Sequence, residues 1–141
     1  MSETVDDLAF DNVAVAVTDM DQSIAWYKRV FGFEVAYRTY STAVQADFVL
    51  LEIRGLRIEL LSKPAIERSP EITPESLLSV SGLKAIVFRT RDLEAVTARF
   101  ERLDLTFVWK LRSISADGLR ATMIRDPDGN LINVLSYPDT R

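Results

Sequence analysis

An internal repeat limits the folds that this chain can adopt. Residues 55–64 align with residues 129–138 at an offset of 74 positions, and five of the ten aligned residues are identical. At an offset of 73 positions, residues 13–27 align with residues 86–100, and Asp19 then coincides with Asp92. Such self-similarity predicts one supersecondary unit that occurs twice in the chain.

Each copy shows the pattern of a strand, a helix and three further strands. Short runs rich in valine and other apolar residues predict the strands, and apolar residues at helical spacing predict the helices. Asp19 and Asp92 are the expected N-caps, Gly32 is an expected C-cap, and residues 126–129 are expected to form a tight turn. The expected strands are 12–17, 34–39, 46–53, 56–62, 83–89, 107–112, 119–125 and 131–136, and the expected helices are 21–31 and 93–103.

The length and composition fit one globular domain. The chain has 141 residues, of which 48% are hydrophobic and 27% are charged. This is enough apolar material to form a core. Three prolines and no clear period between residues 63 and 82 indicate a connector. We therefore expect a single domain over residues 1–141, with module one at 8–64, a connector at 65–81 and module two at 82–138.

Several classes of protein are excluded or disfavoured by what the sequence lacks. With no cysteine, the chain can form neither disulfides nor thiolate metal sites. A net charge of −4 with mixed signs argues against a nucleic-acid partner. No apolar run reaches the ~20 residues that span a bilayer, and the first ten residues do not resemble a secretion signal. We expect a cytoplasmic protein without a membrane partner.

Four local patterns together resemble a known family. They are the doubled plan of strand, helix and three strands, the apolar opening at residues 10–17, the Phe31-Gly32-Phe33 segment, and the turn at residues 126–130. Their order is similar to that of the vicinal oxygen chelate superfamily, which includes glyoxalases, bleomycin resistance proteins and extradiol dioxygenases. The resemblance implies an α+β fold in which two tandem βαβββ modules form an incomplete barrel, or cup, around a small-molecule ligand.

The resemblance also implies a test for a metal site. Enzymes of this superfamily commonly bind a divalent metal through one side chain from each of four equivalent strands, which correspond to Asn12, Glu59, Ala85 and Asn133. The resemblance implies that these four positions converge in one cavity. Only Glu59 is a usual metal ligand. Ala85 has no donor atom, an amide oxygen is a neutral and weak ligand, and the chain contains no histidine. We therefore expect no metal and no other cofactor.

The resemblance and the residue types together select the candidate site. Glu59 is the candidate catalytic residue, because a carboxylate in a cup can act as a general base. The full set of expected ligand-binding residues is Asn12, Tyr37, Phe48, Glu59, Trp109, Arg120 and Asn133. Arg112 and Arg120 can each hold an anion through a bidentate fork.

Each of these assignments has a structural alternative. Glu59 can be an acid paired with Arg57 or Arg120, and the two asparagines can bind only their neighbouring backbone. About half of the aromatic strand residues are expected in the core, because alternate strand residues point to opposite faces. Either arginine can simply end in solvent.

Three functions remain open. The first is a metal-free binding protein for a small aromatic or amphipathic metabolite or antibiotic. The second is a metal-independent isomerase or lyase with Glu59 as proton shuttle. The third is a metal-dependent lyase or dioxygenase with relocated ligands, which would need an all-oxygen site.

Whichever function is correct, we expect a homodimer. The resemblance favours it, because members of the superfamily often dimerise. The connector also carries apolar residues that need a surface to cover: Ile66, Ile72, Leu77, Leu78 and Val80.

Overall fold

The chain folds into two modules of the same topology. The computed structural model describes residues 6–139. Module one contains β1 (Val13–Ala16), α1 (Met20–Phe31), β2 (Glu34–Ser41), β3 (Ala46–Ile53) and β4 (Leu56–Ser62). Module two contains β5 (Ala85–Arg89), α2 (Leu93–Arg102), β6 (Thr106–Ser113), β7 (Arg120–Arg125) and β8 (Leu131–Ser136). All ten expected elements are confirmed. The fifth strand begins at Ala85, two residues later than expected.

The strand pairing is the same in both modules. The sheet orders are β1-β4-β3-β2 and β5-β8-β7-β6, with the first pair parallel and the others antiparallel. Ala14 pairs with Glu59 in module one, and Val87 pairs with Asn133 at the same place in module two. The repeat seen in the sequence is therefore a repeat in three dimensions, and the predicted α+β fold of two βαβββ modules is confirmed.

Local sequence signals define the two helices. The carboxylate of Asp19 accepts a hydrogen bond from the backbone N–H of Gln22, and that of Asp92 accepts one from Ala95, so both act as N-caps. Helix α1 ends at Gly32, whose φ of 83° is in the left-handed region that glycine adopts without strain.

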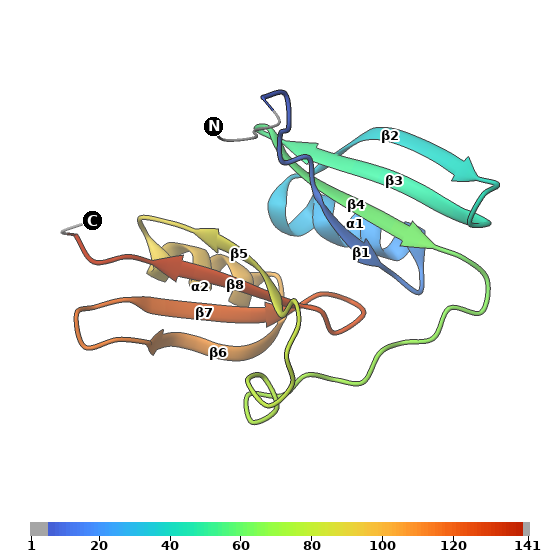
Figure 1. Ribbon diagram of the computed structural model, residues 1–141. Helices are drawn as coiled ribbons and strands as arrows, with labels where there is room; N and C mark the ends of the chain where they lie inside the picture. The colour runs from blue at the N-terminus through green and yellow to red at the C-terminus, as the bar shows by residue number, and fades with distance from the viewer. Residues whose placement is uncertain (1–5, 140–141) are drawn as a thin grey trace, which may run out of the picture.

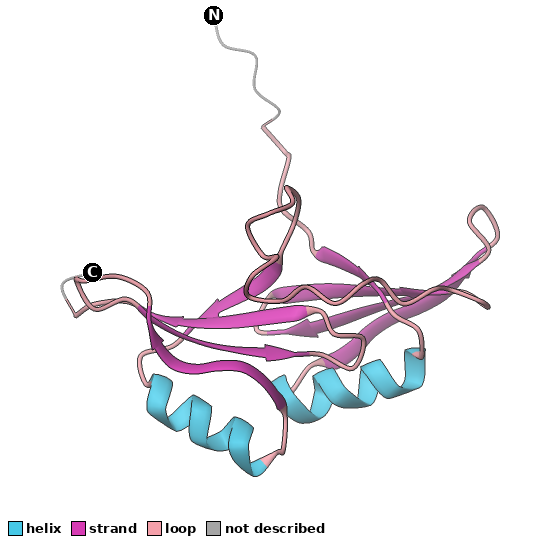
Figure 2. Cartoon of the chain, turned by 90° about the horizontal axis from the view of Figure 1, so that it is seen from below, coloured by secondary structure: helices cyan, strands magenta, loops and turns pink. Residues whose placement is uncertain are grey.

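The two sheets lie side by side, and both helices pack on the same side of them (Figures 1 and 2). In module one, Val49, Leu51, Ile58 and Leu60 face the helix and are almost fully buried. The alternate residues of these strands point to the opposite side, which neither α1 nor α2 covers. We call this side of each sheet its open face. The two open faces are the parts of the molecule where a ligand can reach a sheet.

Direct contacts join the modules on the helix side. The Phe31 ring stacks on the Phe88 ring at 4.7 Å between centroids. Arg99 of α2 donates hydrogen bonds to the carbonyl oxygens of Arg29 and Val30 at the end of α1, and Arg29 donates one to the Leu103 carbonyl at the end of α2. Each helix thus supplies an arginine to the carboxyl end of the other, where free carbonyl groups favour a cation.

Candidate functional site

A small cavity lies on the open face of module one. Its volume is about 170 Å³. Four of its lining residues are among those expected from the sequence: Asn12, Tyr37, Phe48 and Glu59. The others are Asp11, Thr39 and Leu50. We take this cavity as the candidate site because it combines an acid, an amide and two aromatic rings on one surface.

Strand register explains why these side chains meet. Glu59 pairs with Leu50, and Leu50 pairs with Tyr37, so the three lie in one row across β4, β3 and β2. Phe48 and Thr39 form the next row. Residues opposite each other in antiparallel strands have neighbouring side chains on the same face. The row is completed on the β1 side by Ala14, which leaves room beside Glu59.

The carboxylate of Glu59 has no hydrogen bond or ion pair with the residues that the structure describes, 6–139. Both arginines considered as its partners are engaged elsewhere. Arg57 pairs with Glu52 at 2.7 Å and with Asp11 at 3.0 Å. Arg120 pairs with Glu94 at 2.6 Å. The alternative in which Arg57 or Arg120 neutralises Glu59 is therefore not what the structure shows.

The remaining expected residues belong to module two. Trp109 and Asn133 flank Met123 in the row of its open face that is equivalent to the Tyr37–Leu50–Glu59 row. Arg120 is different. Arg120 lies two residues before Thr122 on β7, so both side chains point to the same side of the sheet. Thr122 contacts α2, and Arg120 forms an ion pair with Glu94 of that helix. The structure therefore separates Arg120 from the other expected residues and places it on the helix side.

The four positions equivalent to a metal site do not share one cavity in this chain. Asn12 and Glu59 line the module-one cavity, but Ala85 and Asn133 do not. Our expectation that all four converge is therefore wrong for the single chain, because the two sheets stand side by side instead of facing each other (Figure 1). The donors do not suit a divalent metal either, since Glu59 supplies the only anionic oxygen of the four. Among residues 6–139, no three histidine, cysteine or acidic side chains gather as a metal site would require.

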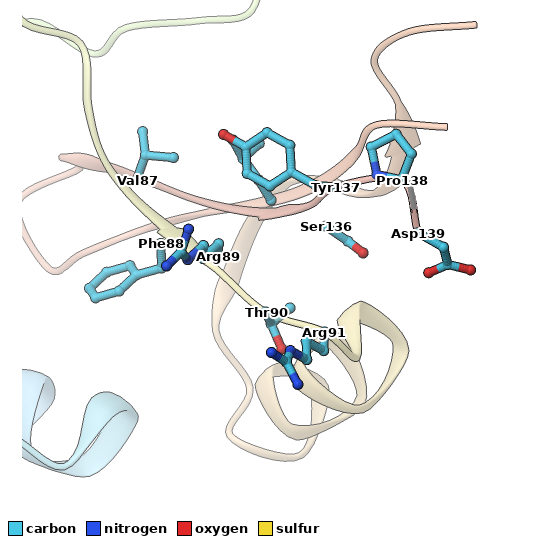
Figure 3. A pocket seen from close by; sticks show the side chains of 10 residues that line it. Val87, Phe88, Arg89, Thr90, Arg91, Ser136, Tyr137, Pro138 and Asp139 are labelled. Atoms are coloured by element: carbon cyan, nitrogen blue, oxygen red, sulfur yellow. The ribbon is translucent and has the colours of Figure 1, made fainter. Parts of the chain in front are cut away.

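A larger open hollow, of about 1060 Å³, lies at the carboxyl ends of β5 and β8. Figure 3 shows Arg89 and Arg91 on one side of it and Tyr137 on the other. None of the residues expected from the sequence lines this hollow. Arg89 lies two residues after Val87 on β5, so both side chains point to the open face of module two. Arg89 could not be predicted as a site residue from the sequence, because a single arginine at the end of a strand is usually solvated.

Comparison with known proteins defines the class. The profile of the Glyoxalase/Bleomycin resistance protein/Dioxygenase superfamily matches residues 9–134, and the chain belongs to this superfamily. No curated protein matches the sequence significantly. Among residues 6–139, neither helix is long and apolar enough to cross a membrane.

Solved structures agree with this assignment. A glyoxalase family protein from Enterococcus faecalis has a TM-score of 0.77 at 19% identity, and the match covers 93% of this chain and 99% of that one. A trypanothione-dependent glyoxalase I from Leishmania major has a TM-score of 0.69 at 17% identity, with 92% and 87% covered. A genomically encoded fosfomycin resistance protein from Listeria monocytogenes has a TM-score of 0.67 at 18% identity, with 93% of each chain covered. At these identities the likeness establishes the fold alone.

Proposed function

We propose that this protein binds a small aromatic or amphipathic molecule, a metabolite or an antibiotic, on its open faces without a metal. The observation that carries the proposal is the module-one cavity, in which Tyr37 and Phe48 provide apolar surface and Asn12 and Glu59 provide polar groups. Apolar walls with a few polar groups are the usual composition of a ligand site. One structural neighbour is a fosfomycin resistance protein, which is consistent with an antibiotic as one class of ligand.

The cavity is small for a drug-sized ligand, which commonly needs ~300 Å³ or more. A second protein surface over the open face would enlarge and close it. We propose that a second copy of this chain supplies that surface. Large apolar side chains are exposed near both open faces and on the connector, at Leu8, Phe10, Leu78, Val80, Leu83 and Val87. The connector residues Ile66, Ile72 and Leu77 are partly covered by their own chain, so Leu78 and Val80 carry most of the argument.

A screen on metal-stripped protein tests the binding proposal. Thermal unfolding is followed in the presence of metabolites and antibiotics, because a ligand that binds only the folded state raises the unfolding temperature. At least one aromatic or amphipathic compound should do so equally in chelator and in added zinc. A stabilising effect that appears only with added metal would contradict the metal-free proposal.

A second candidate function is a metal-independent isomerase or lyase in which Glu59 moves a proton. This function is favoured by the Glu59 carboxylate, which lines the cavity and has no partner within the described part of the chain. Glu59→Gln keeps the shape of the side chain but removes its basicity. If the protein is this enzyme, Glu59→Gln abolishes turnover of the screened ligand while its binding persists. If the protein only binds, the screened ligand is recovered unchanged from wild type.

A further inference from the structure

Strand β6 contains an irregularity that its counterpart in module one lacks. Both modules have a β-bulge at the same place, between Val35 and Tyr37 in β2 and between Phe107 and Trp109 in β6. Beyond that point β2 continues in regular register, whereas β6 has a second bulge between Trp109 and Arg112. Because module one reaches the same topology without it, the second bulge is not required by the fold.

The second bulge is strained and is held by buried groups. Leu111 has a φ of 47°, a conformation that costs a non-glycine residue about 1–2 kcal/mol. Its backbone N–H donates to the Thr122 hydroxyl at 3.0 Å, and that hydroxyl is hydrogen bonded to the Thr97 hydroxyl of α2 at 2.7 Å. Bulges and local strain that are supported in this way often aim a side chain at a functional site.

The consequence of this bulge is the position of Arg112. The extra residue pairs Arg112 with Ala121 and brings it to the open face of module two. There the guanidinium stacks over the Trp109 ring at 4.8 Å from its centroid. A guanidinium stacked on an aromatic ring is fixed in orientation while its in-plane N–H groups stay available for an oxyanion. Within residues 6–139, no carboxylate forms an ion pair with Arg112.

Other groups on this face complete an anion-binding surface. The row that contains Arg112 and Ala121 continues through Leu135 to Arg89, which also has no ion pair among the described residues. Two arginines therefore stand at the ends of one row, with only aliphatic side chains between them.

The neighbouring row of the same face has unused hydrogen-bonding groups. Trp109 Nε1 and Asn133 Oδ1 are both shielded from solvent and have no hydrogen-bond partner among residues 6–139. An unpaired buried polar group costs about 1–3 kcal/mol, so a bound molecule that supplies its partner is favoured. The donor on Trp109 and the acceptor on Asn133 lie on either side of Met123, next to the arginine row.

We infer that Arg112 anchors an oxyanion of the ligand on the open face of module two, with Arg89 as a second cation. The ligand class is thereby narrowed to molecules with an apolar body and a carboxylate or phosphate group. This inference rests on the proposed binding function and deepens it. Module one does not offer the same chemistry, because the free charge in its cavity is the carboxylate of Glu59.

Calorimetric titration of the full chain with three matched probes tests the inference. Benzoate and phenyl phosphate carry the two oxyanions, and benzamide has the shape of benzoate without its charge. At low ionic strength we expect at least one oxyanion to bind about tenfold or more tightly than benzamide. The tighter of the two anions identifies the carboxylate or the phosphate as the preferred group.

Three variants test the assignment to Arg112, and the first of them, Arg112→Ala, removes the guanidinium and should weaken oxyanion binding at least tenfold. Arg112→Lys keeps the charge but loses the planar fork, so it should weaken oxyanion binding about tenfold. Lys110→Ala is the matched control, since it removes a positive charge from the same strand and should leave binding unchanged. Thermal unfolding of all three variants verifies that they are folded. Unchanged oxyanion affinity in folded Arg112→Lys and Arg112→Ala would overturn the assignment.

The outcomes also separate this inference from the function on which it rests. If benzamide binds as tightly as benzoate, a small-molecule site exists but the anion preference is wrong. If none of the three probes binds while the thermal screen finds an uncharged ligand, the anion class is again wrong and the binding function stands. If neither experiment finds a ligand, both fail.

Discussion

At the scale of single residues, Asp126 and Asp128 connect the turn before β8 to module one. The buried carboxylate of Asp126 accepts hydrogen bonds from the Tyr27 hydroxyl at 2.8 Å, from the backbone of Asp128 and Asn130, and from the Asn130 amide. Nearby, Asp128 accepts from the Thr18 hydroxyl and backbone. The turn that the sequence predicted at residues 126–129 is therefore also a structural joint between β8 and module one.

The Tyr27 hydroxyl should contribute measurably to stability. Tyr27→Phe removes a hydrogen bond to a buried carboxylate but leaves the ring in place. We expect the free energy of unfolding in urea to fall by about 1–2 kcal/mol, because hydrogen bonds to charged groups are among the stronger ones. Tyr40→Phe, at a residue that is 56% exposed, is the control and should have no effect. Equal stability of wild type and Tyr27→Phe would show that the joint does not depend on this bond.

Stability in alkali should depend on the same hydroxyl. Burial, followed by the negative charge of Asp126 and the hydrogen bond to it, raises the pKa of Tyr27 far above its ordinary value of 10.0. Above pH 10 the unfolded chain releases this proton while the folded chain keeps it, so the free energy of unfolding falls as pH rises. One proton corresponds to about 1.4 kcal/mol per pH unit. Between pH 10 and 11, Tyr27→Phe should therefore lose less stability than wild type in urea titrations, and parallel losses would contradict this.

At the scale of the elements, the sequence could not show which side of the sheet each strand residue faces. Periodicity and caps predicted the ten elements, because those signals are local. The face of a residue, in contrast, depends on counting along a strand, and each bulge in β6 shifts that count by one. Arg120 is among the ligand-binding residues expected from the sequence, but it lies on the helix side. Arg112 reaches the open face only because of the second bulge. Nothing in the residues 106–113 marks that bulge, since Leu111 is not a glycine.

The second bulge gives a prediction for Leu111 itself. Glycine tolerates a positive φ, so the free energy of unfolding of Leu111→Gly should stay within about 1 kcal/mol of wild type. Leu111→Val should lose about 1–2 kcal/mol, because branched residues fit this conformation poorly. Leu56 is the matched control, since it is 38% exposed, against 39% for Leu111, and has no positive φ. There the order should reverse, with glycine more damaging than valine. The same order at both positions would mean that Leu111 is not strained.

At the scale of the whole molecule, the arrangement of the modules was beyond the sequence. The repeat shows that two similar units exist, but their side-by-side packing depends on contacts between residues 69 or more positions apart, such as Arg99 with Val30 and Tyr27 with Asp126. The connector is also fixed by long-range contacts. Arg125 donates to the Ile72 carbonyl and pairs with Glu71, which holds one part of the connector against module two. Leu78 and Val80, further along the connector, stay exposed.

The exposed apolar side chains lead to the prediction of a homodimer. Leu83 is 99% exposed and Leu78 is 91% exposed, and water-exposed side chains of this size commonly mark an interface when several occur together. In a twofold dimer the same apolar patch of each chain packs against its copy on the other chain. An obligate interface of this kind should bury more than ~2,000 Å² in total.

Light scattering at micromolar concentration should therefore give twice the 15.9 kDa mass of one chain. The double variant Leu78→Asp with Leu83→Asp should give 15.9 kDa, because a carboxylate is costly to bury without a partner. Val44→Asp, at a 55% exposed residue between β2 and β3, is the control and should remain dimeric. A wild-type mass of one chain would refute the dimer, and a double variant that stays dimeric would place the interface elsewhere.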